Sequence, residues 1–404
     1  MFCGKPFIAE KQEGYNERWG VVFNKQYATL NTGFYAQLTE EIEKVWQESR
    51  MTAKDRRLRD KFMEYLYRKT GMCNFKTKLF LNVFKLFSTC GTVSSDMDLC
   101  YVIKTSKVAN ETKYKLPIEK YSEEINAYII DRINKALRDF KEIRDIDSRP
   151  ARVPIVNFKM NTKDVMPEVE PREFDFDINC NCVAGIYNAY LLGGLANFDD
   201  RLPKLSIIIK KWAKDVKIVA DYRFNSYNVV LLIVHYLQCG VNPPVLPNLM
   251  KLQPKDYDGE TEPWNLTTSM DRDSLPEPEN KMGVGALLCG FFRYYAQFDF
   301  NSYGILIRYA SVIKMRDHEP FDGLRGSRMF VEEPYDGLTV PKNIKQESDF
   351  MHIRYEFKIA KVIMNSGVKE KTSLKALQSR QVPPGVATRE DELEEAQARF
   401  KRLR

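Results

Sequence analysis

Acidic and apolar residues alternate in two short stretches of the chain. In "SSDMDLCYVI" one residue separates Asp96 from Asp98, and in "FDFDINC" one residue separates Asp175 from Asp177. A strand directs alternate side chains to opposite faces, so each pair of aspartates lies on one face of its strand. Carboxylates that share a face repel one another unless a cation lies between them. The spacing leaves two interpretations, which are acids that flank lysines on a wet surface and acids that hold a metal ion.

The apolar run after Asp98 favours the metal site. It indicates a central strand, where acidic side chains are hard to solvate. Three carboxylates on neighbouring strands, close to a Gly-Thr loop, suit phosphoryl transfer with two divalent cations roughly 3.5–4 Å apart. Oxygen ligands of this kind are the ones that Mg²⁺ prefers.

Other segments show the periodicity of the elements that must position these acids. Helices are predicted over residues 31–69, 117–140, 183–195, 200–215, 226–239 and 283–297. Besides the segment that holds Asp96 and Asp98, strands are predicted over residues 76–87, 151–160 and 172–180. A Pro-rich polar stretch between the last two helices is expected to be a long loop. Residues 389–404 are compatible with a terminal helix that has few apolar anchors, so we expect it to be exposed or bound to a partner.

Composition is ordinary for a soluble globular protein. The 404 residues are 44% hydrophobic and 29% charged, with a net charge of +7, which permits nucleic-acid binding without indicating it. No apolar run reaches the roughly 18–20 residues of a membrane span, and we expect no secretory signal. The eight cysteines lie mostly in apolar contexts, which predicts reduced thiols. Cys180 and Cys182 form a C-x-C pair with no nearby histidine, which is a poor zinc site.

Five motifs occur in an order that resembles the DNA polymerase beta-type nucleotidyltransferases, most of all the non-canonical, cytoplasmic poly(A) polymerases of the germline GLD type. The resemblance covers about residues 30–365. The motifs are "CGTVSSDMDL", "FDFDINCNCVAGIYNAYLL", "IIIKKWAKD", "FNSYNVVLLIVHYL" and "FVEEPYDG". It implies an α+β fold in which a small mixed-sheet, palm-like nucleotidyltransferase domain faces a mostly helical central domain across a cleft.

The resemblance implies the roles of the acids. Asp96 and Asp98 would bind both of two Mg²⁺ or Mn²⁺ ions. Asp177 would bind the catalytic ion and help to deprotonate the RNA 3′-hydroxyl. Gly91 and Thr92 are the nearest match to the family's Gly-Ser, which holds the triphosphate. The family's loop is usually longer than the one in this chain. Here only three residues separate Thr92 from Asp96.

The remaining motifs imply contacts with the nucleotide. Asn188 matches an asparagine that contacts the ribose. Lys210 and Lys214 match two lysines that bind the β- and γ-phosphates, and their spacing of four places them on one helix face. Ser226 matches a phosphate-binding serine, and Tyr227 matches a tyrosine that stacks on the base. Glu333 matches an acid in the nucleotide-recognition loop.

We divide the chain by this pattern into four parts. They are an N-terminal extension with helices that pack on the helical domain (1–70), the nucleotidyltransferase domain (71–182), the helical central domain with the recognition loop (183–368) and a charged tail (369–404).

The sequence favours ATP as the donor. Uridine-adding relatives carry a histidine a few residues after the acid-Pro pair, where this chain has Thr339. The expected function is cytoplasmic addition of AMP to RNA 3′ ends. The alternatives are a terminal uridylyltransferase that uses UTP and a catalytically silent scaffold of a ribonucleoprotein.

The sequence also points to a protein partner. No RNP motif, G-x-x-G loop or zinc finger is visible, so we expect weak RNA binding by the chain alone. An RNA-binding adaptor of the KH or RRM type is the expected partner, and no membrane is involved. The basic stretch "KDRRLRDK" is interpreted as a wet helix face, although it suits phosphate contacts as well.

Overall fold

Two units are defined by the contacts of the chain in the computed structural model. The structure describes residues 32–69, 77–80, 90–103, 123–149, 155–180, 182–261, 263–266, 275, 277–315, 327–370 and 374–381. Unit 1 holds the described residues of 49–197 and 253–272, and unit 2 holds those of 2–48, 198–252 and 273–404. Among the described helices, none combines the length and the apolar character needed to cross a bilayer.

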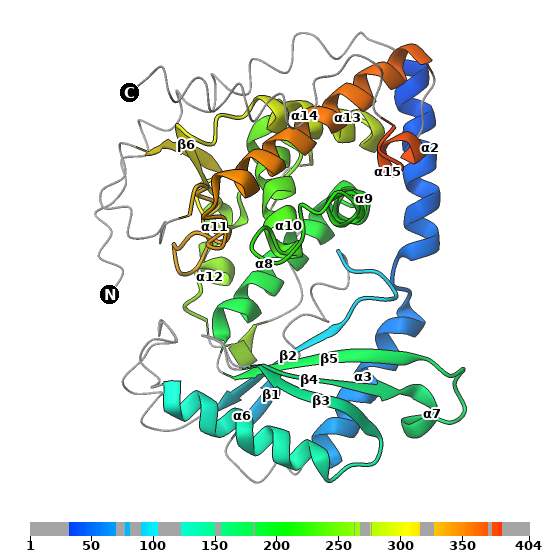
Figure 1. The fold of residues 1–404 in the computed structure, drawn as a ribbon, viewed down its shortest axis with the longest axis vertical. Coiled ribbons are helices and arrows are strands. Elements are labelled where there is room, and N and C mark those ends of the chain that lie inside the picture. Colours follow the sequence, from blue (N-terminus) through cyan, green and yellow to red (C-terminus); the bar gives the residue numbers. More distant parts are fainter. Residues whose placement is uncertain are drawn as a thin grey trace. The chain divides into compact units, whose positions relative to one another are not determined.

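Unit 1 is built on a five-stranded mixed sheet (Figure 1). Its strands are β1 (Thr77–Phe80), β2 (Met97–Ile103), β3 (Ile143–Arg149), β4 (Ile155–Asn161) and β5 (Glu173–Cys180). They are ordered β1-β2-β5-β4-β3, with β2 parallel to β5 and the other neighbours antiparallel. The predicted α+β fold with a small mixed sheet is confirmed, and β2 is an interior strand as its apolar run predicts.

One face of this sheet is covered by α3 (Ala53–Lys69) and α6 (Glu123–Arg138) (Figure 1). Along β5 every second side chain is buried, and Phe176 stacks on Phe158 of β4 with ring centroids 4.8 Å apart. Burial of aromatic and aliphatic side chains on this face fixes the register, since a slip of one residue would expose all of them. The register thereby directs Asp175 and Asp177 to the opposite face.

The helix α3 begins with a capping box. The backbone N–H of Asp55 donates to the Thr52 hydroxyl at 3.2 Å, and Thr52 donates back to the Asp55 carboxylate from its own N–H at 2.9 Å. Phe62 and Leu66 of this helix are buried in the core of unit 1. The sequence-based division placed α3 with the helical domain, whereas these contacts place it on the sheet.

The helix α8 (Val183–Phe198) follows β5 and extends unit 1. Its Tyr187 hydroxyl donates to Thr261 O at 2.7 Å, and Tyr190 stacks on Tyr257 at 5.0 Å. These contacts fasten part of the predicted long loop onto α8. That loop is not free of secondary structure, because it contains α11 (Leu249–Leu252), α12 (Pro254–Tyr257) and a 3-10 turn (Pro263–Asn265).

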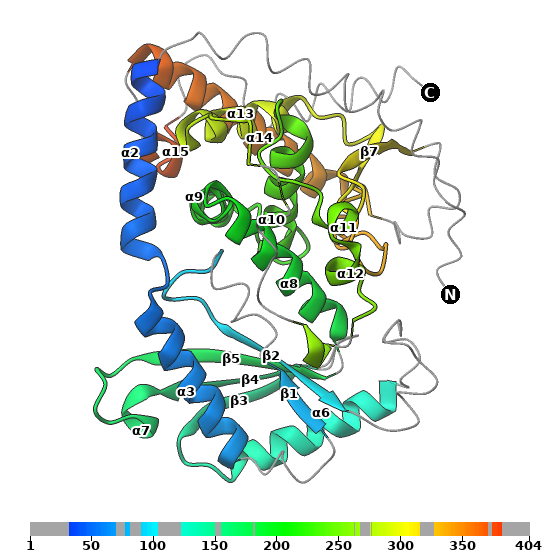
Figure 2. The ribbon, with the colours of Figure 1, turned by 180° about the vertical axis from the view of Figure 1, so that it is seen from behind.

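Unit 2 is mostly helical (Figure 2). Its main helices are α2 (Thr32–Ser49), α9 (Arg201–Asp215), α10 (Ser226–His235), continued by a π-helical turn (Tyr236–Gly240), α13 (Val284–Gln297), α14 (Glu347–Glu370) and α15 (Leu374–Gln378). The helix α9 contacts α10, α13 and α15. It is held there by Trp212, whose ring meets Phe292 at 4.7 Å.

Several of the described elements are missing from the sequence-based prediction. The strand β3 is rich in charged residues and irregular, since Asp145 has a positive φ of 53° and the register shifts beside it. The hairpin of β6 (Tyr303–Leu306) and β7 (Ser311–Lys314) has strands of only four residues. The helix α14 was expected only as part of a helical domain. The predicted strand 76–87 is described only as far as Phe80, and the predicted terminal helix lies outside the described residues.

Candidate active site

The carboxylates of β2 and β5 meet on the sheet face opposite α3 and α6. Asp98 of β2 is the register partner of Asp177 of β5. Adjacent strands lie about 4.8 Å apart, so these two side chains are direct neighbours. Asp96 is exposed and immediately precedes β2, two residues before Asp98 and therefore on the same side. The parallel pairing of two strands that are distant in sequence thus sets Asp98 beside Asp177, with Asp96 two residues before Asp98.

Asp177 has a second neighbour on its other side. Asn157 of β4 is its register partner, and the Asn157 side-chain amide donates to Asp177 Oδ1. An outer-shell hydrogen bond of this kind orients a ligating carboxylate. Sequence analysis did not identify Asn157, because nothing in the sequence gives the register between β4 and β5.

Asp175 belongs to a surface ion cluster instead. Lys159 Nζ lies 3.9 Å from Asp175, 3.6 Å from Glu173 and 3.5 Å from Asp145. These acids raise the pKa of Lys159, Glu173 most strongly. The interpretation as acids that flank a lysine therefore describes Asp175, while Asp177 lies one step further along the same face.

The residues fit a divalent cation by their chemistry and by the register of their strands. Three carboxylates are the hard oxygen donors that Mg²⁺ takes, with waters and substrate phosphates as the other ligands. Within the described part of the chain, no three His, Cys, Asp or Glu side chains are gathered closely enough to hold an ion.

The predicted phosphate-binding residues Gly91 and Thr92 begin a tight turn just before β2. The N–H of Ser95 donates to Thr92 O at 3.0 Å, and the N–H of Thr92 donates to Ser95 Oγ at 2.8 Å. Thr92 also pairs with Arg50 in an isolated bridge, and Gly91 is buried. The short loop is therefore well bonded, and it leads directly into the aspartates.

Asn188 completes the predicted residues of unit 1. It lies on α8 and is 8% exposed. Its side-chain oxygen has no hydrogen-bond partner among the described residues. A buried amide oxygen without a partner costs free energy in the isolated protein, which is consistent with a site that binds a ligand hydroxyl.

Lys210 and Lys214 lie on α9 in unit 2, with Lys214 exposed and Lys210 half-buried. Trp212, between them in sequence, is 2% exposed, so it points into the core as predicted. The two lysines share the outer side of the helix.

Ser226 and Tyr227 open α10, whose first turn is capped by the Asn225 side chain. Tyr227 lies beside Glu333 although 106 positions separate them, counted from 227 to 333. Burial of its hydroxyl, together with the negative charge of Glu333, raises the pKa of Tyr227 well above 10. The structure thus brings the predicted stacking tyrosine and the predicted recognition acid together.

Glu333 holds its loop by accepting two backbone hydrogen bonds. The N–H groups of Tyr335 and Asp336 donate to its Oε2, at 2.8 Å and 2.5 Å. Thr339, in the register of the uridine-reading histidine, donates to Met329 O at 2.9 Å and accepts from Val331 N at 3.3 Å. Sequence analysis missed Glu332, a 6% exposed acid that accepts from Arg308 N at 2.9 Å.

The predicted site residues therefore form two groups. Unit 1 carries Gly91, Thr92, Asp96, Asp98, Asp177 and Asn188, and unit 2 carries Lys210, Lys214, Ser226, Tyr227 and Glu333.

Two family models match the chain. Residues 38–194 match "Poly(A) RNA polymerase, mitochondrial-like, central palm domain", and residues 283–337 match "Cid1 family poly A polymerase". The first match contains all the predicted residues of unit 1, and the second contains Glu333.

Curated relatives and solved structures agree with these models. The chain is 28% identical to human Poly(A) RNA polymerase GLD2 over 330 residues, which are 79% of the chain and 63% of that protein. It is 32% identical to Poly(A) RNA polymerase GLD2-B of Xenopus laevis over 276 residues, 66% of the chain and 48% of that protein. The chain thus spans less than two thirds of the length of these relatives.

Among solved structures, the GLD-2/RNP-8 complex is similar with a TM-score of 0.65 and 24% identity, covering 85% of this chain and 98% of that one. The Cid1 poly(U) polymerase has a TM-score of 0.61 and 23% identity, covering 81% and 94%. The structural likeness shows a shared fold. The family models and the curated relatives support a GLD-type non-canonical poly(A) polymerase.

Proposed function

We propose that this chain is a template-independent RNA nucleotidyltransferase that adds AMP from ATP to RNA 3′ ends. The observation that supports this most is the register of β2 against β5, which sets Asp98 beside Asp177 with Asp96 one step before.

The cation is proposed to be Mg²⁺ or Mn²⁺, as two ions held by Asp96, Asp98 and Asp177. The bound ions would lower the pKa of the RNA 3′-hydroxyl and neutralise charge on the triphosphate. Magnesium-bound nucleotides in solved structures of the related Cid1 support a divalent ion.

The residues of the chain itself bind and orient the reactants. Asp177, whose carboxylate accepts a hydrogen bond from Asn157, would accept the proton of the attacking hydroxyl. The turn at Gly91 and Thr92 binds the triphosphate, and Asn188 offers its unpartnered amide oxygen to the ribose. Lys210 and Lys214 balance the charge of the β- and γ-phosphates, and Tyr227 stacks on the base. Positioning and charge neutralisation of this kind supply most of the rate enhancement in phosphoryl transfer.

The preference for ATP rests on Thr339. Its hydroxyl donates to Met329 O and accepts from Val331 N, so it bonds to the backbone of its own loop and is not directed at a base as a histidine would be. UTP remains the second candidate because Cid1, a structural relative, is named a poly(U) polymerase. A silent scaffold is disfavoured because all three aspartates are present on the appropriate strands.

A protein partner is part of the proposal. The solved relative GLD-2 is in a complex with RNP-8. We infer that this chain works with an RNA-binding adaptor of the KH or RRM type, because no RNA-binding motif is visible in its sequence. We also infer that it works in the cytoplasm.

Extension of a labelled RNA with each single NTP and Mg²⁺, with and without EDTA, tests the proposal. We expect extension with ATP above all, and none in EDTA. If extension with UTP equals or exceeds extension with ATP, UTP and not ATP is the preferred donor. No extension with any NTP, even with an adaptor added, would support the scaffold.

A further inference from the structure

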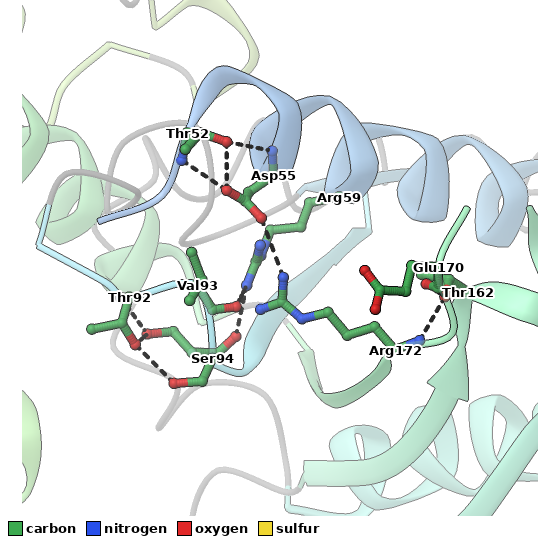
Figure 3. Close-up of polar contacts among 10 residues, drawn as sticks. Thr52, Asp55, Arg59, Thr92, Val93, Ser94, Thr162, Glu170 and Arg172 are labelled. Atoms are coloured by element: carbon green, nitrogen blue, oxygen red, sulfur yellow. Dashed lines mark hydrogen bonds and ion pairs between the residues drawn. The ribbon is translucent and has the colours of Figure 1, made fainter. Parts of the chain in front are cut away.

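A buried arginine holds the turn that precedes the catalytic strand. Arg59 of α3 is 0% exposed, although the neighbouring residues Arg56 and Arg57 are exposed. Its Nη2 donates to Val93 O at 2.8 Å and to Ser95 O at 3.2 Å (Figure 3). The side chain thus reaches from the helix to the two carbonyls that flank Ser94.

These bonds fix the direction of the peptide groups in the turn. In a trans peptide the C=O and the following N–H point in opposite directions. Because the carbonyls of Val93 and Ser95 point at Arg59, the N–H groups of Ser94 and Asp96 point away from it. Outward backbone N–H groups of a turn can donate to a bound anion.

Hydroxyl groups cluster at the same turn. Thr92 Oγ1 lies 3.0 Å from Ser94 Oγ and 3.4 Å from Ser95 Oγ, as Figure 3 shows for Thr92 and Ser94. Such hydroxyls can donate to phosphate oxygens once they are released from one another. The turn therefore offers both backbone and side-chain donors.

The same helix also fastens the start of β5. Asp55 accepts from Arg172 Nη1 at 3.2 Å, and Arg172 immediately precedes β5. The guanidinium groups of Arg59 and Arg172 lie 4.8 Å and 4.7 Å from the Phe174 ring. One helix thus holds both the turn before Asp96 and the strand that carries Asp177.

Burial of this charge is costly, which argues against a role in packing alone. Desolvation, with the charge of Arg172, lowers the pKa of Arg59 to about 10, and Asp55 only partly opposes this. An apolar side chain of similar size would fill the space with less penalty, but would leave the partly buried carbonyls of Val93 and Ser95 without these donors.

We propose that Arg59 is a positioning residue for triphosphate binding, which acts by turning the N–H groups of Ser94 and Asp96 toward the phosphates. The inference rests on the proposed function, since it presumes that the turn binds the nucleotide. It adds Arg59 and Ser94 to the residues that the sequence pattern identifies.

Binding of MgATP, inorganic tripolyphosphate and adenosine to the full chain tests this role, with Arg59→Met, Arg59→Lys and the exposed control Arg57→Met. We expect Arg59→Met to weaken binding of MgATP and tripolyphosphate about ten- to a hundredfold, with adenosine binding unchanged. Arg59→Lys, with its single ammonium group, should fall between it and the wild type. Arg57→Met should bind like the wild type.

The outcomes separate this inference from the proposed function. Wild-type protein that binds neither MgATP nor tripolyphosphate overturns both. If the wild type binds MgATP and tripolyphosphate and Arg59→Met binds them equally well, only the proposed role of Arg59 is overturned. If Arg59→Met does not fold, Arg59→Lys decides, since a lower melting temperature with unchanged tripolyphosphate affinity shows that Arg59 serves the fold alone.

Discussion

Two groups of acidic residues show how differently the same chemical group is used in the two units. In unit 1, Asp96, Asp98 and Asp177 lie on the face of the sheet opposite α3 and α6, and they are exposed or half-buried. In unit 2, Glu332 and Glu333 are 6% and 8% exposed and accept hydrogen bonds from backbone N–H groups. Acids that keep access to solvent can take up a cation, whereas acids enclosed by backbone donors fix the shape of a loop.

The largest effect is expected at Asp177. Asp177→Asn removes one charge from the proposed ion site and should lower kcat by at least about 10³-fold, which corresponds to ~4 kcal/mol. The melting temperature should stay within a few degrees of the wild type, because the side chain is not part of the core. Single-turnover extension of labelled RNA, with a thermal melt of the same sample, measures both. Activity within tenfold of the wild type would show that Asp177 is not a catalytic residue.

At Glu333 we expect a substitution to lower the stability of the fold, which Asp177→Asn leaves nearly unchanged. Glu333→Ala leaves the buried N–H group of Tyr335 and the partly buried one of Asp336 without their acceptor, so the free energy of unfolding should fall by about 2–4 kcal/mol. Glu333→Gln keeps an acceptor oxygen and should lose clearly less. Urea unfolding of both variants measures this difference. If the two variants are equally stable, the carboxylate does not hold the loop.

Glu332 makes the stability of unit 2 depend on pH. Burial raises its pKa from 4.5 to about 7, with Arg308 opposing the shift. The folded protein therefore holds a proton that the unfolded chain releases, so this contribution is present below pH 4.5 and is lost as the pH rises toward 7. It amounts to about 3 kcal/mol, at ~1.4 kcal/mol per pKa unit.

Glu332→Gln should abolish this dependence, so that the variant gains stability relative to the wild type between pH 5 and pH 8. Urea unfolding across this range measures the gain. The exposed Glu40→Gln serves as the matched control and should run parallel to the wild type. A constant difference between Glu332→Gln and the wild type at every pH would show that Glu332 does not titrate in this range.

The smallest effect is expected at Asp175, the exposed neighbour of Asp177. Its ion pair with Lys159 is 3.9 Å long and shared with two other acids. Asp175→Asn should change stability by less than about 0.5 kcal/mol and leave extension unchanged. A loss of activity comparable to that of Asp177→Asn would mean that the register argument selects the wrong aspartate.

The contrast between the units also marks what the sequence can predict. The alternation in β2 and β5 predicts which aspartates share a face, and helical spacing predicts that Trp212 is buried while Lys210 and Lys214 are not. Such features depend on side chains a few positions apart. The pairing of Asn157 with Asp177, and of Tyr227 with Glu333, depends instead on which distant elements pack together.

Arg59 lies between these cases. The residues around Arg59 in "KDRRLRDK" are charged, which favours a solvent-exposed helix face. Yet Arg59, Phe62 and Leu66 follow the i, i+3, i+7 spacing of one helix face, which is the buried face of α3. The spacing contained the signal, but only the carbonyls of the turn, 34 and 36 positions away, explain why an arginine is placed there.

The central claim is that Asp96, Asp98 and Asp177 hold the catalytic ions. Anomalous diffraction from crystals of the chain with Mn²⁺ and a non-hydrolysable ATP analogue tests it directly. We expect manganese between the carboxylates of Asp98 and Asp177, in contact with the triphosphate. Manganese and nucleotide bound elsewhere, with these aspartates turned apart, would contradict the account.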